Sequence, residues 1–103
     1  MDKIAGLREI LAQDPKNTLA RYGIAMELAN RGEVDASLAE FNTLLVNNPD
    51  YTAAYFMAAQ ALEKAGRTSE AVERLKAGID SARRTGNQHA MSEMQGMLDE
   101  LDR

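Results

Sequence analysis

Apolar residues recur along the chain at helical spacing, and the same apolar stripe occurs three times. The copies lie 34 residues apart and consist of Ile4, Leu7, Ile10 and Leu11; Leu38, Phe41, Leu44 and Leu45; and Val72, Leu75, Gly78 and Ile79. Steps of three and four residues place such side chains on one face of an α-helix. The pattern predicts three related helices, and the first, in residues 1–15, has no companion helix before it.

Prolines and glycines divide the remaining chain into helical segments. Pro15 and Pro49 each end a segment, because the proline nitrogen cannot donate a hydrogen bond and the residue before proline avoids the helical region. Gly32 and Gly66 each follow an apolar-periodic run, where a left-handed C-terminal cap favours glycine. The expected N-caps of the helices that follow these glycines are Asp35 and Ser69.

This punctuation predicts two helix pairs, in residues 18–51 and 52–85. The first helix of each pair carries a small residue, Ala25 or Ala59, where two helices must approach closely. A single pair cannot bury both of its apolar faces, so similar pairs stack and share a core. The sequence therefore predicts an all-α fold in a single domain over residues 1–103.

The last part of the chain departs from the repeat. Arg83 stands where a third proline would fall, so the preceding helix is expected to continue to Thr85, with Gly86 as its cap. A closing helix is predicted in residues 87–102. Its apolar stripe consists of Met91, Met94, Leu98 and Leu101, broadened by Ala90 and Met97, and its exposed acidic residues are Glu93, Asp99, Glu100 and Asp102.

Composition and charge argue against several classes of function. Twelve basic and sixteen acidic residues give a net charge of −4, which opposes binding to a nucleic-acid backbone. No apolar run suits a signal peptide or a membrane helix, so a soluble cytoplasmic protein is expected. There is no cysteine, and the one histidine, His89, has no partners at the spacing of a catalytic triad. We predict no catalytic residue, no metal site and no cofactor.

The repeat resembles the tetratricopeptide repeat (TPR) family. Besides the 34-residue period, the resemblance is carried by Ala25, Leu28, Ser37, Phe41 and Pro49 in the first copy and by Tyr55, Ala59, Leu62, Gly66, Ala71 and Leu75 in the second. It implies a right-handed α-solenoid of antiparallel helix pairs with six helices in all. It also implies a non-catalytic adaptor or scaffold that binds a protein or peptide partner in a concave groove.

The first helix of the first pair carries a second apolar stripe that the packing pattern does not use. In proteins of this family the equivalent face lines the groove, which makes Leu19, Tyr22, Met26 and Phe56 candidate apolar contacts. The candidate polar rim is formed by Asn30, Gln60 and Lys64. For Leu19 and Met26, burial between helices is the alternative interpretation. For Tyr22 and Phe56 the groove is favoured, because aromatic side chains with one wet edge suit recognition surfaces.

One use of the groove within the family is not expected here. Chaperone adaptors of this family hold the C-terminal carboxylates of a partner with a constellation of lysine, asparagine and arginine. The matching positions of this chain carry Tyr22, Met26 and Met57. The resemblance therefore does not extend to the binding of chaperone tails.

Self-assembly is the alternative function. The predicted N-terminal helix has no partner helix to cover Leu7 and Ile10. A second copy of the chain would cover them, and a homodimer with a two-fold interface is the simplest closed arrangement. In that case the groove or the N-terminal helix serves oligomerisation.

Overall fold

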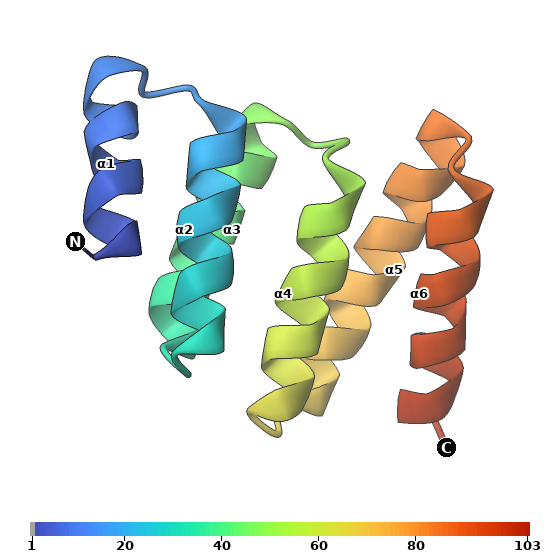
Figure 1. Cartoon of the computed structure of the whole chain (residues 1–103). Helices are drawn as coiled ribbons and strands as arrows, with labels where there is room; N and C mark the ends of the chain where they lie inside the picture. The colour runs from blue at the N-terminus through green and yellow to red at the C-terminus, as the bar shows by residue number, and fades with distance from the viewer. Residues whose placement is uncertain (1) are drawn as a thin grey trace. The chain divides into compact units, whose positions relative to one another are not determined.

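The computed structural model describes residues 2–103, and these residues form six α-helices and no strand (Figure 1). The helices are α1 (Lys3–Gln13), α2 (Thr18–Asn30), α3 (Val34–Asn47), α4 (Thr52–Lys64), α5 (Thr68–Thr85) and α6 (Gln88–Leu101). The predicted all-α class is confirmed. The chain divides between Asn48 and Pro49 into two compact units. Unit 1 contains α1 to α3, and unit 2 contains α4 to α6.

Left-handed glycines end the first helix of each pair, as predicted. Gly32 and Gly66 have φ angles of 79° and 76°. The residue after each glycine donates its backbone N–H to the carbonyl five residues earlier, at 2.9 Å in both turns. This bond belongs to the Schellman motif, which satisfies a carbonyl that the helix end leaves open. Gly86 ends α5 directly after Thr85 in the same conformation, which confirms the predicted extent of that helix.

The helices after the two glycine turns begin earlier than expected. Their N-cap positions fall on Glu33 and Arg67, so the prediction of Asp35 and Ser69 as N-caps is wrong. The glycine and the residue after it complete the reversal of the chain, which therefore enters the next helix at once. Asp35 lies instead in the first turn of α3, where its negative charge interacts favourably with the positive end of the helix dipole.

Unit 1 is built around α2, which contacts both α1 and α3. The buried apolar residues of unit 1 are Ile4, Leu11, Ala20, Ile24, Ala25, Leu28, Leu38, Phe41, Leu44 and Leu45. Ala25 is fully buried, and its carbonyl accepts a hydrogen bond from Ser37 Oγ at 3.0 Å. A larger residue at this position would therefore separate α2 from α3.

The start of α1 is tied to the end of α2 by an ion pair between Asp2 and Arg31. Asp2 is also the N-cap of α1, because its Oδ1 accepts a hydrogen bond from the backbone N–H of Ile4 at 3.4 Å. The hydrogen bond from Arg31 is the main cause that lowers the pKa of Asp2 below its ordinary value of 3.8. The charged form of Asp2 is thus the form that the folded unit favours.

The substitution Asp2→Asn is expected to lower the melting temperature slightly at pH 7 and to have no effect well below pH 3.8. Because the folded-state pKa is depressed, the carboxylate stabilises the fold above the unfolded pKa, and this contribution is lost as the pH falls through the folded pKa. Asparagine retains the N-cap, so the difference isolates the ion pair. Thermal unfolding followed by circular dichroism at the two pH values measures it. A difference that persists at low pH would contradict this role of the charge.

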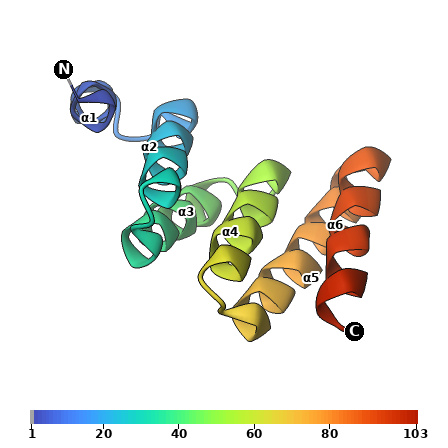
Figure 2. The same ribbon diagram turned by 60° about the horizontal axis from the view of Figure 1, so that its bottom comes forward.

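Unit 2 is built around α5, which contacts both α4 and α6 (Figure 2). The start of α4 is fixed to α5 by a buried hydrogen bond between the hydroxyls of Thr52 and Ser81 at 2.8 Å. The hydroxyl of Tyr55 donates to the carbonyl of Pro49 at 2.7 Å and fixes the chain that leads into α4. These bonds hold the start of α4 against α5 and against the chain that precedes it.

Gly78 is the point at which the three helices of unit 2 meet. A Cβ atom on Gly78 would lie 2.5 Å from Sδ of Met94 on α6 and 2.7 Å from Cβ of Tyr55 on α4. Met94 is fully buried, so α6 seats this side chain in the space that the missing Cβ leaves on α5. The predicted apolar stripe of the closing helix is buried at Met94 and Leu98, and its four acidic residues are exposed.

Candidate functional site

A groove runs along unit 2 between α4 and α6, because both helices pack on α5 and approach each other less closely. Each helix presents one stripe to this groove at steps of three and four residues. The stripes are Ala53, Phe56, Met57, Gln60, Glu63 and Lys64 on α4, and Ala90, Glu93, Met94, Met97, Glu100 and Leu101 on α6. A helix rises about 1.5 Å per residue, so the α4–α6 groove is roughly 16 Å long.

The α4–α6 groove consists of two clefts of different character. The first cleft, near the start of both helices, has a volume of about 320 Å³, and apolar side chains dominate its lining. Phe56 and Met57 are half-buried there, and Met94 lies beneath them fully buried. The second cleft has a volume of about 410 Å³ and is lined mainly by polar and charged residues, with Met97 and Leu101 as its apolar members. The groove thus offers apolar surface at one end and hydrogen-bonding groups at the other.

His89 and Glu93 lie at the edge of the first cleft, one helical turn apart on α6. His89 Nε2 is 3.1 Å from Glu93 Oε1. The histidine side chain is 86% exposed, and that of Glu93 is 48% exposed. The edge of an apolar cleft therefore carries a carboxylate.

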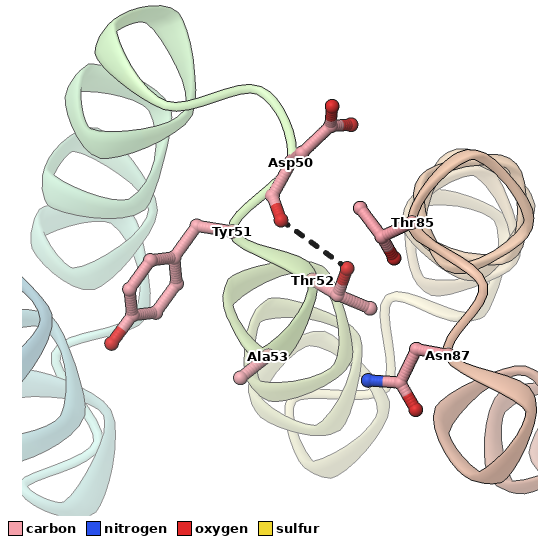
Figure 3. A pocket seen from close by; sticks show the side chains of 6 residues that line it. All are labelled: Asp50, Tyr51, Thr52, Ala53, Thr85 and Asn87. Carbon is pink, nitrogen blue, oxygen red and sulfur yellow. Dashed lines mark hydrogen bonds between the residues drawn. The ribbon is translucent and has the colours of Figure 1, made fainter.

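A shallower hollow adjoins the first cleft at the start of α4 (Figure 3). Its lining residues are Asp50, Tyr51, Thr52, Ala53, Thr85 and Asn87, and its volume is about 380 Å³. The Thr52 hydroxyl donates to the carbonyl of Asp50 at 3.4 Å, while the ring of Tyr51 points away from the other side chains in the figure. Because Thr52, Ala53 and Asn87 also line the first cleft, the hollow extends the groove at this end.

The acidic group of this hollow is neutralised by an arginine. Arg84 donates to Oδ1 of Asp50 from Nε at 3.0 Å and from Nη2 at 2.7 Å. This hydrogen bonding raises the pKa of Arg84 above its ordinary value. The hollow therefore offers hydroxyl and amide groups rather than a net charge.

The predicted contact residues of the first repeat lie along α2 in unit 1. Leu19 is 72% exposed, so it does not belong to the core of that unit. Met26 is half-buried and Asn30 is exposed. Tyr22 is half-buried, and its ring meets the buried ring of Phe41 edge-on, with centroids 6.3 Å apart and planes at 67°. Tyr22 therefore supports the core of unit 1 in addition to presenting surface on α2.

The candidate residues of the sequence divide between the two units. Phe56, Gln60 and Lys64 lie together along the α4–α6 groove of unit 2. The self-association candidates lie on α1 in unit 1. Leu7 is half-buried and packs against Gly23, where a Cβ atom would lie 3.1 Å from Leu7 Cδ1. Ile10 is 46% exposed.

Sequence reasoning missed the wall of the groove that α6 provides. It interpreted the methionines of the closing helix only as a cover for the last repeat. The 34-residue period could have predicted this wall. The residues 34 positions after Phe56, Gln60 and Glu63 are Ala90, Met94 and Met97. All three line the α4–α6 groove. In the closing helix, the positions equivalent to the groove residues of α4 still line the groove, whereas the positions equivalent to the core residues of the repeat no longer follow the repeat pattern.

In residues 2–103, no group of three or more histidine, cysteine, aspartate or glutamate side chains could hold a metal ion. Within the same residues, no helix combines the length and the apolar character that crossing a membrane requires. The α4–α6 groove offers apolar area, amides, carboxylates and the ammonium group of Lys64.

Comparison with known proteins yields a family and close structural relatives. Residues 22–84 match the family model of the tetratricopeptide repeat. A TPR repeat-containing protein of Pseudomonas aeruginosa is 27% identical over 100 residues, which span 97% of this chain and 95% of the relative. The solution structure of a protein from Bordetella parapertussis has a TM-score of 0.86 at 25% identity and covers 99% of this chain and 89% of its own. A tetratricopeptide repeat domain protein from Salinibacter ruber has a TM-score of 0.77 at 30% identity, over 84% and 88% of the two chains.

Proposed function

Because the chain belongs to the tetratricopeptide repeat family, we propose that it is a non-catalytic interaction module that holds a segment of a partner protein in the α4–α6 groove. Domains of this family generally bind proteins or peptides. The observation that supports this site is the pair of facing stripes on α4 and α6, which leave Phe56 and Met57 half-buried beside a fully buried Met94. Large apolar side chains that one domain leaves partly uncovered are common at binding sites.

The dimensions of the groove limit what it can hold. An extended chain advances about 3.3 Å per residue, so roughly five residues of an extended partner span the groove. An amphipathic helix could instead lay one apolar face along it. In both cases an apolar anchor enters the first cleft, while Gln60 and Lys64 in the second cleft bond to polar groups of the partner.

The exposed face of α2 supports a second contact surface for a partner. Leu19 supplies an exposed apolar side chain, and Asn30 supplies an exposed amide on the same helix. Met26 and Tyr22 add half-buried apolar area. A partner that contacts this face would gain affinity from Leu19 without disturbing the core of unit 1.

Blocking the groove is expected to abolish partner binding without unfolding the protein. Ala53 is exposed and lines both the first cleft and the adjoining hollow, so Ala53→Gln fills the groove and removes no core contact. Peptides selected from a displayed random library against the parent chain should bind this variant at least about tenfold more weakly, a loss of ~1.4 kcal/mol. Fluorescence anisotropy of the labelled peptides gives the dissociation constants.

The matched control is Ala36→Gln, which adds the same side chain to an exposed alanine near the start of α3, outside the groove. It should leave the dissociation constants unchanged. Phe56→Ala tests the same site by removing an aromatic side chain from the first cleft, whereas Ala53→Gln adds a side chain to it. Selected peptides that bind Ala53→Gln and the parent equally well would exclude the groove as the binding site.

Self-association remains the second candidate, and the exposure of Ile10 on α1 favours it. In that case sedimentation equilibrium of the parent chain gives the mass of a dimer, and Ile10→Asp gives the mass of a monomer. A parent chain that sediments as a monomer at high concentration excludes this candidate.

A further inference from the structure

We propose that the partner segment held in the α4–α6 groove is both apolar and cationic. An apolar side chain occupies the first cleft, and lysine or arginine residues next to it face the carboxylates of Glu63, Glu93 and Glu100. This inference rests on the proposed function of the groove and adds the chemistry of the partner.

The apolar requirement follows from the lining of the first cleft. Phe56, Met57, Ala90 and Met94 contribute only carbon and sulfur atoms from their side chains to a cleft of about 320 Å³. A polar side chain placed against these four residues would lose hydrogen bonds to water and gain none from their side chains, which is costly. Methionine side chains also adapt their shape to different apolar groups. The anchor is therefore an apolar side chain, and its shape is not narrowly restricted.

The cationic requirement follows from the charges along the groove. Three carboxylates line it, from Glu63, Glu93 and Glu100, and the ammonium group among its lining residues is that of Lys64. Among residues 2–103, no lysine or arginine makes an ion pair with any of the three glutamates. Glu93 has the 86% exposed side chain of His89 beside it, and even with this group counted the carboxylates outnumber the basic side chains that line the groove. The groove therefore presents an excess of negative charge.

Several acidic side chains elsewhere in the chain are paired with arginine. The pairs are Asp2 with Arg31, Glu40 with Arg8 and Arg21, Asp50 with Arg84, Glu70 with Arg67, and Asp80 with Arg83. The hollow at the end of the groove belongs to this compensated part of the surface, because Asp50 lines it. In the part of the chain that the structure describes, three carboxylates without an arginine or lysine partner thus lie along one groove that also contains an apolar cleft.

Opposite charges at the rim of an interface mainly determine specificity and the rate of association. Exposed pairs of this kind change affinity by roughly two- to fivefold each, and added salt screens them. An acidic segment would place like charges next to each other, which disfavours it even if its apolar anchor fits. The net charge of −4 acts in the same direction over a longer range.

Three short capped peptides test the inference directly. They share the same leucine and serine positions and differ only in carrying lysine, glutamine or glutamate at the remaining positions. We expect the lysine peptide to bind the parent chain at least about tenfold more tightly than the glutamate peptide at low salt, with the glutamine peptide in between. The ratio of the dissociation constants of the glutamate and lysine peptides should shrink as sodium chloride is added. Chemical-shift changes of the Met94 and Met97 methyl groups report binding in the groove.

Variants of the chain identify the charges that matter. Glu93→Gln should weaken the lysine peptide by about two- to fivefold and leave the glutamine peptide unchanged. The combined variant Glu63→Gln, Glu93→Gln and Glu100→Gln should remove most of the preference for lysine over glutamate. The control Glu73→Gln makes the same change of net charge at an exposed residue of α5 outside the groove, and it should change affinity by less than about twofold.

The outcomes separate the chemistry of the partner from the function of the groove. Glutamate and lysine peptides that shift the same methyl signals with equal affinity would overturn the charge requirement and leave the groove as a binding site. If Glu73→Gln weakened binding of the lysine peptide as much as Glu93→Gln does, the net charge of the chain alone would explain the preference. That result would also overturn the charge requirement. If none of the three peptides shifts the signals, the proposed occupant is wrong, and the library experiment with Ala53→Gln decides the function separately.

Discussion

Replacing Gly78 with alanine is expected to lower the free energy of unfolding by roughly 2 kcal/mol, although alanine is the better helix former. The new Cβ would lie 2.5 Å from Met94 Sδ and 2.7 Å from Tyr55 Cβ. The methionine sulfur can move, but Tyr55 Cβ is attached to the backbone of α4, so α4 and α5 must separate. Overpacking of this kind costs up to about 3 kcal/mol, and the gain in helix propensity of ~1 kcal/mol offsets only part of it.

Gly96→Ala is the matched control for this prediction. Gly96 lies on α6, is exposed, and has no atom within 4 Å of the position where a Cβ would be added. Alanine there should stabilise the protein by about 0.5–1 kcal/mol through helix propensity alone. Urea unfolding followed by circular dichroism measures both variants. If both gain stability, the three helices do not meet at Gly78 as described.

The ends of the helices could be predicted where a local signal determines them. Glycine at Gly32, Gly66 and Gly86 allows the left-handed turn that closes a helix, and this preference needs no tertiary contact. The N-caps could not be predicted in the same way. Asp35 and Ser69 have suitable side chains, but the glycine turns return the chain to helical geometry before either residue is reached.

The candidate site was predictable only for the half that repeats. Phe56, Gln60 and Lys64 were found because the second repeat copies the pattern of the first, in which one helix carries a stripe that packing does not use. The groove residues of α6 were missed because the residues at the core positions of this helix differ from those of the repeats. Without that match, α6 was not recognised as carrying the groove positions of the repeat.

The role of Gly78 shows a second limit of the sequence pattern. In the apolar stripe Gly78 is a gap, and the equivalent residue of the preceding copy is Leu44. In the fold this gap receives Met94 from α6, and Met94 in turn lies beneath the first cleft. Periodicity indicates which residues face the interior of a helix pair. It does not indicate which distant side chain fills a vacancy, because that depends on tertiary packing.

Phe41→Ala is expected to be the most damaging single substitution considered, with a loss of about 3–5 kcal/mol in the free energy of unfolding. Phe41 is fully buried on α3, and Tyr22 meets its ring edge-on at 6.3 Å. Chains of about 100 residues have a total stability of only about 5–15 kcal/mol, so unit 1 should lose most of its stability. Urea unfolding measures the loss, and amide signals of α2 and α3 show where it occurs. The control Phe41→Leu retains most of the volume and should cost less than about 1.5 kcal/mol.

A double-mutant cycle with Tyr22→Ala separates the ring contact from the volume of Phe41. Edge-to-face pairs contribute about 0.5–1.5 kcal/mol beyond the area they bury, so the two substitutions should be non-additive by that amount. Additive effects would mean that Tyr22 is independent of the core and that its ring is available to a partner. Coupled effects would mean that a partner bound on α2 meets a tyrosine that Phe41 already holds in place. Such an anchor loses less conformational freedom on binding, so the contact that stabilises unit 1 would also favour recognition at its surface.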